Sequence, residues 1–171
     1  MKVENDNGVG LVIWNNLIKI QEVALIILSV CVVSLMSLLV IFRYILKIDL
    51  FGIEEIVVIF AFWLYFIGGS FGSYTRSHIT ADVITMYIKD DRLRDKIKLV
   101  TSFVTVVLSF ILTYYALDFF IWGINKGART AVWQIPLVIP QSSVFIGYAI
   151  MTFYFSVYLI NDLKIYQKSY K

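Results

Sequence analysis

The feature that most constrains this sequence is a set of four long apolar windows, at residues 23–42, 56–73, 99–124 and 142–160. A helix needs about 20 mostly apolar residues to cross the ~30 Å hydrocarbon core of a bilayer. Helices of soluble domains normally keep one polar face. The sequence therefore predicts an all-α membrane protein with four transmembrane helices, in which residues 1–171 form a single integral membrane domain.

The first window shows how strong this signal is. Fourteen of its twenty residues are Val, Leu, Ile or Phe, and none is charged. At about −0.3 to −0.6 kcal/mol each, these side chains contribute about −4 to −8 kcal/mol towards membrane insertion. No small-residue cleavage pattern follows the window. The first span is therefore predicted to be retained rather than removed as a signal peptide.

The segment before the first window, residues 10–20, mixes apolar residues such as Trp14 with Asn15, Asn16 and Lys19. This pattern is typical of a short helix that lies in the membrane interface. It fits an extension of the first transmembrane helix equally well. The sequence leaves both alternatives open.

The composition removes several function classes. The chain is 60% hydrophobic and 16% charged, which excludes an ordinary soluble enzyme and a disordered tail. The net charge of +3 is small and scattered, which excludes a nucleic-acid-binding domain. Cys31 is the single cysteine and His78 the single histidine. An internal disulfide, a cysteine metal cluster and a haem held by two histidines of this chain are therefore excluded, and no cofactor or metal is expected.

The distribution of Lys and Arg predicts the orientation in the membrane. With four spans, both termini lie on one side. The tails and the middle connection hold eleven of these residues, whereas the other two connections hold four, namely Arg43, Lys47, Lys126 and Arg129. Because cytoplasmic segments carry the excess of positive charge, both termini are expected in the cytoplasm.

The middle connection, residues 74–98, is the longest. Its apolar residues recur at spacings of three and four between Ile79 and Ile88, which predicts an amphipathic surface helix between the second and third spans. Residues 89–98 are nearly all charged and are expected to form a solvated turn on the cytoplasmic side.

Ionisable side chains are missing from the middle of every predicted span, and Asp118 lies about a turn and a half inside the third. A carrier that works alone would show a charge near the midplane or paired broken helices. A proton pump would need a chain of titratable groups. An independent transport path is therefore not expected.

Glu54 and Glu55 open the second span. Adjacent residues on a helix point about 100° apart, so at most one of the two acids faces a given partner. Paired glutamates also occur in some intramembrane proteases, but here the acids and His78 are separated by about 27–36 Å of helix. An enzyme is therefore not predicted, and a helix-end role and an interface role remain open for the pair.

Two further clusters lie near the inner end of the second span. Gly68, Gly69 and Gly72 give this part of the helix small sides, which predicts close helix packing. Beyond them, His78 and Asp82 are four residues apart, so a carboxylate could orient the imidazole in a structural corner or in a proton-sensitive latch.

Three short motifs carry a resemblance to a known family. They are Glu54-Glu55, Gly68-Gly69, and Arg76-Ser77-His78-Ile79 leading to Asp82. With the four spans, they make the chain resemble the small (Q-type, DctQ-like) membrane subunit of a tripartite ATP-independent periplasmic (TRAP) transporter. The family often has glycine at the position of Ser77 and a hydrophobic residue at that of Ala81.

The resemblance implies a division of labour in the bacterial inner membrane. A periplasmic substrate-binding protein captures an organic acid, of the sialic acid or C4-dicarboxylate type, and a large (M-type) membrane subunit carries it inward with sodium. The small subunit is implied to be a non-catalytic, static scaffold in the lipid bilayer that also offers a docking surface. It supplies no sodium or substrate ligand.

Candidate contact residues follow from these patterns. Those expected at the subunit interface or in helix packing are Gly68, Gly69, Gly72, Glu54, Glu55, Arg76, His78 and Asp82. Those available to the periplasmic partner are Arg43, Lys47, Lys126 and Arg129. The alternative is the membrane anchor of a respiratory or redox complex, in which His78 could supply one haem ligand.

Overall fold

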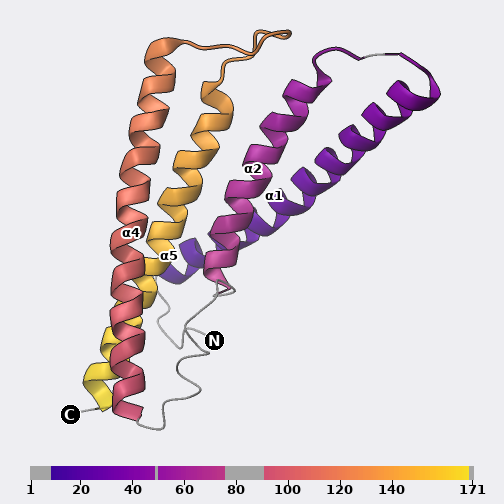
Figure 1. Cartoon of the computed structure of the whole chain (residues 1–171). Helices are drawn as coiled ribbons and strands as arrows, with labels where there is room; N and C mark the ends of the chain where they lie inside the picture. The colour runs from indigo at the N-terminus through magenta and orange to yellow at the C-terminus, as the bar shows by residue number, and fades with distance from the viewer. Residues whose placement is uncertain (1–8, 49, 76–90, 170–171) are drawn as a thin grey trace.

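The structure is a computed structural model of the chain, and it describes residues 9–48, 50–75 and 91–169. These residues form the helices α1 (Val9–Val40), α2 (Ile53–Tyr74), α4 (Asp91–Lys126) and α5 (Val138–Ser169), with a short π-helix, η1 (Ile41–Ile45), after α1 (Figure 1). Apart from one isolated β-bridge, between Arg129 and Pro136, the regular structure of the described residues is all helical.

All four α-helices are long and apolar enough to cross a membrane, which confirms the predicted all-α fold with four spans. The helices extend beyond the predicted windows. At 1.5 Å per residue, the 36 residues of α4 are about 54 Å long. This length exceeds the ~40–45 Å of a bilayer with its headgroups.

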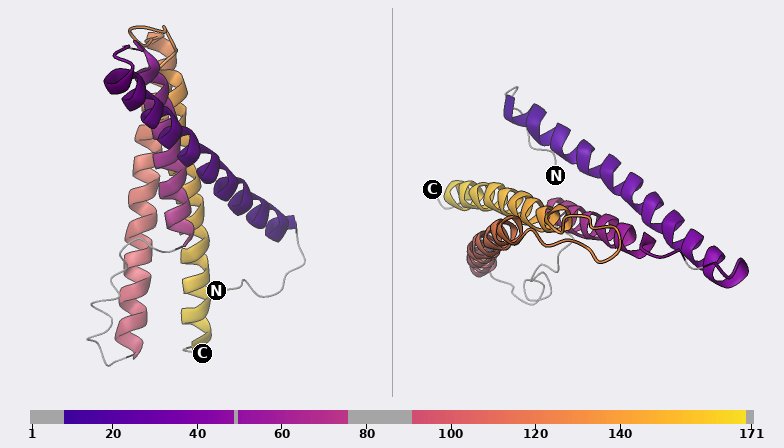
Figure 2. Two further views of the ribbon diagram at one scale, coloured as in Figure 1. Left: turned by 90° about the vertical axis from the view of Figure 1, so that its right-hand side faces the viewer. Right: turned by 90° about the horizontal axis from the view of Figure 1, so that it is seen from above.

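The helices are arranged as a layer rather than as a closed bundle. α5 packs between α4 and α2, and α1 packs on α2. α1 is inclined to the other three helices and crosses them obliquely, as both views of Figure 2 show. Each of these helices therefore leaves a broad face that nothing else in residues 9–48, 50–75 and 91–169 covers.

The exposed surface of this layer is strongly apolar. Only Val57, Val106, Ala116 and Tyr154 are buried apolar residues in the described chain. Large apolar side chains on α1 and α4 are instead widely exposed. Such surfaces require lipid or another membrane protein as a neighbour.

α1 is one continuous helix from Val9 to Val40. The segment 10–20 therefore extends the first membrane helix and is not a separate interfacial helix. A single π-turn then follows before the chain leaves the helix at Leu46.

The predicted charged turn at residues 89–98 is wrong for the part that the structure describes, because Asp91–Lys98 form the first two turns of α4. Lys and Arg are good helix formers, and Leu93 and Ile97 lie on one side at a spacing of four. The predicted amphipathic helix at 79–88, together with Arg76, His78 and Asp82, lies outside the described residues.

Polar side chains connect α4 to α5 along their length. The Thr113 hydroxyl lies 2.8 Å from the Thr152 hydroxyl and 3.2 Å from the carbonyl oxygen of Tyr148. Nearer the chain end, Ser102 donates to the Asp162 carboxylate at 3.0 Å. Bonds of this kind between membrane helices contribute roughly 0.6 kcal/mol on average.

Candidate functional site: the loop end of the helices

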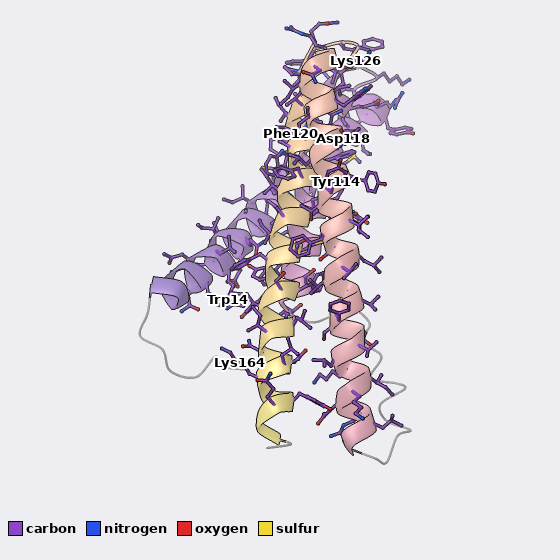
Figure 3. The ribbon with its side chains drawn as sticks, turned by 90° about the vertical axis from the view of Figure 1, so that its left-hand side faces the viewer. Trp14, Tyr114, Asp118, Phe120, Lys126 and Lys164 are labelled. Atoms are coloured by element: carbon purple, nitrogen blue, oxygen red, sulfur yellow. The ribbon has the colours of Figure 1, made fainter. Side chains whose placement is uncertain are left out.

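We call one end of the layer the loop end, because η1, the connection to α2 and the α4–α5 connection all lie there (Figure 1). The opposite end, where α2 ends and α4 begins, is the tail end. Figure 3 shows Lys126 at the loop end of α4 and Lys164 towards the tail end of α5. Most predicted contact residues that the structure describes lie near one of these two ends.

Glu55 ties the start of α2 to the α4–α5 connection. Its Oε1 accepts a hydrogen bond from the backbone N–H of Val132 at 2.8 Å, and its Oε2 accepts one from that of Trp133 at 3.0 Å. A carboxylate that receives two N–H groups forms strong, directed bonds. Glu55 therefore fixes where the α4–α5 connection lies on α2.

The α4–α5 connection has its own internal hydrogen bonds. Around the Arg129–Pro136 bridge, Thr130 N donates to the carbonyl oxygen of Ile135 at 2.9 Å, and Ile135 N donates to the Thr130 hydroxyl at 3.0 Å. Leu137 N donates to the carbonyl oxygen of Ala128 at 2.9 Å. The connection is thus a closed hairpin-like loop, which we call the 128–137 hairpin.

Gly52 allows the hairpin to approach α2 closely. It precedes α2 with φ of +91°, and a Cβ there would lie 2.0 Å from Trp133 Nε1. The indole N–H of Trp133 donates to the carbonyl oxygen of Phe51 at 3.3 Å. Only glycine meets both the backbone conformation and the space at this position.

Glu54 points to a different neighbour from Glu55, as the 100° between adjacent helix residues requires. It forms an ion pair with Arg43 at 3.6 Å, and both side chains are largely exposed. Both residues line a groove of about 420 Å³ between α1 and α2, together with apolar residues that include Met36, Leu39 and Val57. An exposed pair of this kind contributes little stability.

The four predicted docking cations all belong to the loop end. Arg43 lies in η1 and Lys47 in the connection that follows it, whereas Lys126 ends α4 and Arg129 lies in the hairpin. All four side chains are exposed. Large exposed apolar side chains accompany them, of which Phe51 at 76% and Tyr44 at 75% are the most accessible.

Three helices meet in a buried polar contact towards the tail end. Gln21 on α1 donates from Nε2 to Ser70 Oγ at 2.6 Å, and its Oε1 accepts from the Tyr154 hydroxyl at 2.6 Å. Ser70 and Tyr154 are completely buried. The contact therefore joins α1, α2 and α5 at one point.

An aromatic cluster surrounds this contact. The ring of Trp14 lies within 5.0–6.3 Å, between centroids, of the rings of Tyr74, Phe153, Tyr154 and Tyr158. The Tyr158 hydroxyl donates to the carbonyl oxygen of Tyr74 at 2.5 Å. These rings hold the start of α1 on the end of α2.

The glycines of α2 have different neighbours. A Cβ at Gly69 would lie 2.6 Å from the Met151 methyl group on α5, whereas one at Gly68 would lie 3.6 Å from Leu25 on α1. The carbonyl oxygen of Gly72 accepts from the Thr75 hydroxyl at 3.0 Å. Gly68 and Gly69 thus face two different helices of the same chain.

The sequence analysis missed the Gln21 contact and one close approach at the loop end. A Cβ at Gly123 would lie 1.6 Å from Gln141 Oε1, so α4 and α5 nearly touch there. In the sequence, Gln21 is a single amide just before an uncharged apolar window. Composition alone does not distinguish such a buried residue from one that lies at the membrane interface.

The described residues contain no group of three or more His, Cys, Asp and Glu side chains that could hold a metal ion. What the arrangement provides is a braced loop end and wide apolar faces. These features are those of a multi-pass membrane protein whose apolar faces are open to lipid or to other membrane helices.

The sequence matches the family described as tripartite ATP-independent periplasmic transporters, DctQ component, over residues 30–165. The match covers most of the chain, including the whole of α2 and α4, most of α5 and the last part of α1, and the chain belongs to this family. The resemblance to a small TRAP subunit is thereby confirmed, and the alternative of a redox-complex anchor is not favoured. No individual curated protein matches the chain.

Proposed function

We propose that this chain is the non-catalytic scaffold subunit of a sodium-coupled TRAP transporter that takes up an organic acid of the sialic acid or C4-dicarboxylate type. It lies in the bacterial inner membrane with both termini in the cytoplasm. Its partners are the large transport subunit and the periplasmic binding protein. In this proposal the chain holds its position while the large subunit moves the solute.

The observation that supports a scaffold role is the bracing of the layer at both ends. Glu55 connects α2 to the 128–137 hairpin, and hence to α4 and α5. Gln21 connects α1 to α2 and α5 near the other end. Helices that are connected to one another near both ends resist changes in tilt, which a static scaffold requires.

The exposed cations at the loop end support a docking role. With cytoplasmic termini, Arg43, Lys47, Lys126 and Arg129 face the periplasm, next to exposed aromatic side chains. Aromatic and Arg residues are enriched at protein–protein interfaces. Charges around the rim of such a contact mainly set the rate of association.

Reconstitution tests the scaffold proposal. The large subunit is placed in vesicles with and without this chain, and sodium-driven uptake is measured with the binding protein present. We expect uptake to require the chain. Full uptake by the large subunit alone would refute an obligate scaffold.

Charge reversal tests the docking proposal. Lys126→Glu with Arg129→Glu should slow association of the binding protein and make it less dependent on salt, because both charges lie at the loop end. Lys164→Glu, on the tail end of α5, is the matched control. Unchanged association with the loop-end pair reversed would refute docking at these cations.

Orientation is tested by labelling with an impermeant thiol reagent after Cys31→Ser removes the native thiol. A cysteine placed at Lys47 should react from the periplasmic side, and one placed at Lys164 only after the membrane is opened. The reverse pattern would refute cytoplasmic termini.

A further inference from the structure

α4 carries a carboxylate on a face that no other described helix covers. The residues of α4 that are buried against α5 include Ser109 and Ala116. At 100° per residue, Asp118 lies about half a turn round the helix from them. Its side chain is exposed, and in Figure 3 it is drawn on α4 near Tyr114, whereas Phe120 lies on the side of α5.

The residues that share this direction form a continuous stripe, which we call the α4 outward face. Its members are Val107, Ile111, Tyr114, Tyr115, Asp118 and Trp122. They recur at spacings of three and four, and all are exposed. Tyr114 is 69% exposed and Trp122 is 50% exposed. The face is therefore apolar and aromatic except for one acid.

The depth of Asp118 makes its charge unfavourable in lipid. The apolar stretch 99–124 is centred near residues 111 and 112, so Asp118 lies about 10 Å from the centre along the helix. The edge of a ~30 Å hydrocarbon core is about 15 Å from its centre. The carboxylate therefore lies about 5 Å inside the apolar layer, where an ionised side chain calls for a partner.

The described part of this chain does not supply that partner. No hydrogen bond or ion pair joins Asp118 to another described residue. The side chains nearest along its own face, at Tyr114, Tyr115 and Trp122, carry no positive charge. Because Asp118 points away from α5, none of the other described helices covers it.

We propose that the α4 outward face is the contact surface for a membrane helix of the large transport subunit, and that this helix carries a Lys or Arg that pairs with Asp118. This inference rests on the proposed function, because it names the face through which the scaffold holds its partner. Charge complementarity selects the partner, since a lipid chain offers no cation at this depth and a second α4 outward face would place two acids together.

Co-purification tests this pairing. The tagged chain is expressed with the large subunit, and the amount of large subunit retained in mild detergent is measured. Asp118→Asn keeps the size of the side chain and removes its charge, and it should weaken retention about tenfold or more. Glu22→Gln removes an exposed acid from α1 and should leave retention unchanged.

A second variant and a second readout keep the test independent of folding. Asp118→Glu keeps the charge and should restore most of the retention. The chain alone, with Asp118→Asn, should melt at the wild-type temperature. A photoreactive residue at Tyr114, one turn from the carboxylate, should cross-link to a large-subunit peptide that contains Lys or Arg.

Unchanged retention with Asp118→Asn would overturn this inference and leave the scaffold proposal intact. Cross-linking at Tyr114 only to lipid, or only to a second copy of this chain, would overturn it as well. If the wild-type chain retains no large subunit, the scaffold proposal itself fails.

Discussion

Removing one hydroxyl from the buried contact between α1, α2 and α5 should destabilise the protein measurably. In Tyr154→Phe, the Gln21 Oε1 loses the donor that now lies 2.6 Å away. Tyr154 is completely buried and Gln21 is 3% exposed, so water does not replace the lost bond freely.

The expected cost lies between two reference values. An unsatisfied buried acceptor costs about 1–3 kcal/mol in soluble proteins. Side-chain hydrogen bonds in a membrane protein average roughly 0.6 kcal/mol, with a maximum near 1.7. Since the ring itself stays packed against Trp14, we expect a free energy of unfolding lower by about 1–2 kcal/mol.

The assay is thermal unfolding of the purified protein in detergent. A loss of 1–2 kcal/mol corresponds to a melting temperature lower by roughly 2–8 °C for a chain of this size. Tyr114→Phe is the matched control, because it removes the same hydroxyl from a side chain that is 69% exposed. It should melt within a degree or so of the wild type.

A double-mutant cycle then separates the bond from other effects. Gln21→Leu removes the acceptor, so adding Tyr154→Phe to it should cost less than Tyr154→Phe costs alone. If the two changes add to within about 0.3–0.5 kcal/mol, the two side chains do not stabilise each other and the reasoning is refuted.

The loop end supports two further predictions. Gly52→Ala should destabilise the protein by at least about 1–2 kcal/mol, because of its positive φ and its contact with Trp133. Gly127→Ala, at φ of +58° with nothing within 4 Å, should cost less in the same melting assay, and equal losses would contradict this account. Glu55→Gln replaces one acceptor oxygen by a donor, so the hairpin amides that bond to Glu55 should exchange with solvent faster. Glu54→Gln should leave that exchange unchanged. If the same amides exchange as slowly with Glu55→Gln as in the wild type, the Glu55 carboxylate does not hold the hairpin.

The number and nature of the helices could be predicted because each apolar window is long enough to decide the matter by itself. The residues at which each helix begins and ends could not be predicted in this way. Residues 10–20 and 91–98 are too polar to lie in the hydrocarbon core, so hydropathy places them outside the spans. They are helical all the same, because a helix continues into water when its residues favour helix formation. Windows chosen by hydropathy end where the lipid ends, and the helices continue beyond.

The candidate site was predictable in part. Helical geometry alone required Glu54 and Glu55 to face different neighbours, and the structure gives them Arg43 and the hairpin. That the neighbour of Glu55 is a backbone 77 residues away depends on how a loop folds, which no local pattern encodes. Gln21 and Tyr154, 133 residues apart, pair only because α1 crosses α5 at that point.

The length of α4 has a consequence for how the protein sits in its surroundings. Its first two turns are charged, and Lys126 closes its other end. If α4 shifted by one turn along the membrane normal, about 5.4 Å, in either direction, cationic side chains at one of its ends would move towards the hydrocarbon core. Each such charge costs up to about 2.5–3.5 kcal/mol at the centre of a membrane. The charges at both ends therefore limit how far α4 can shift along the membrane normal, which keeps the helix at a nearly constant depth beside any partner.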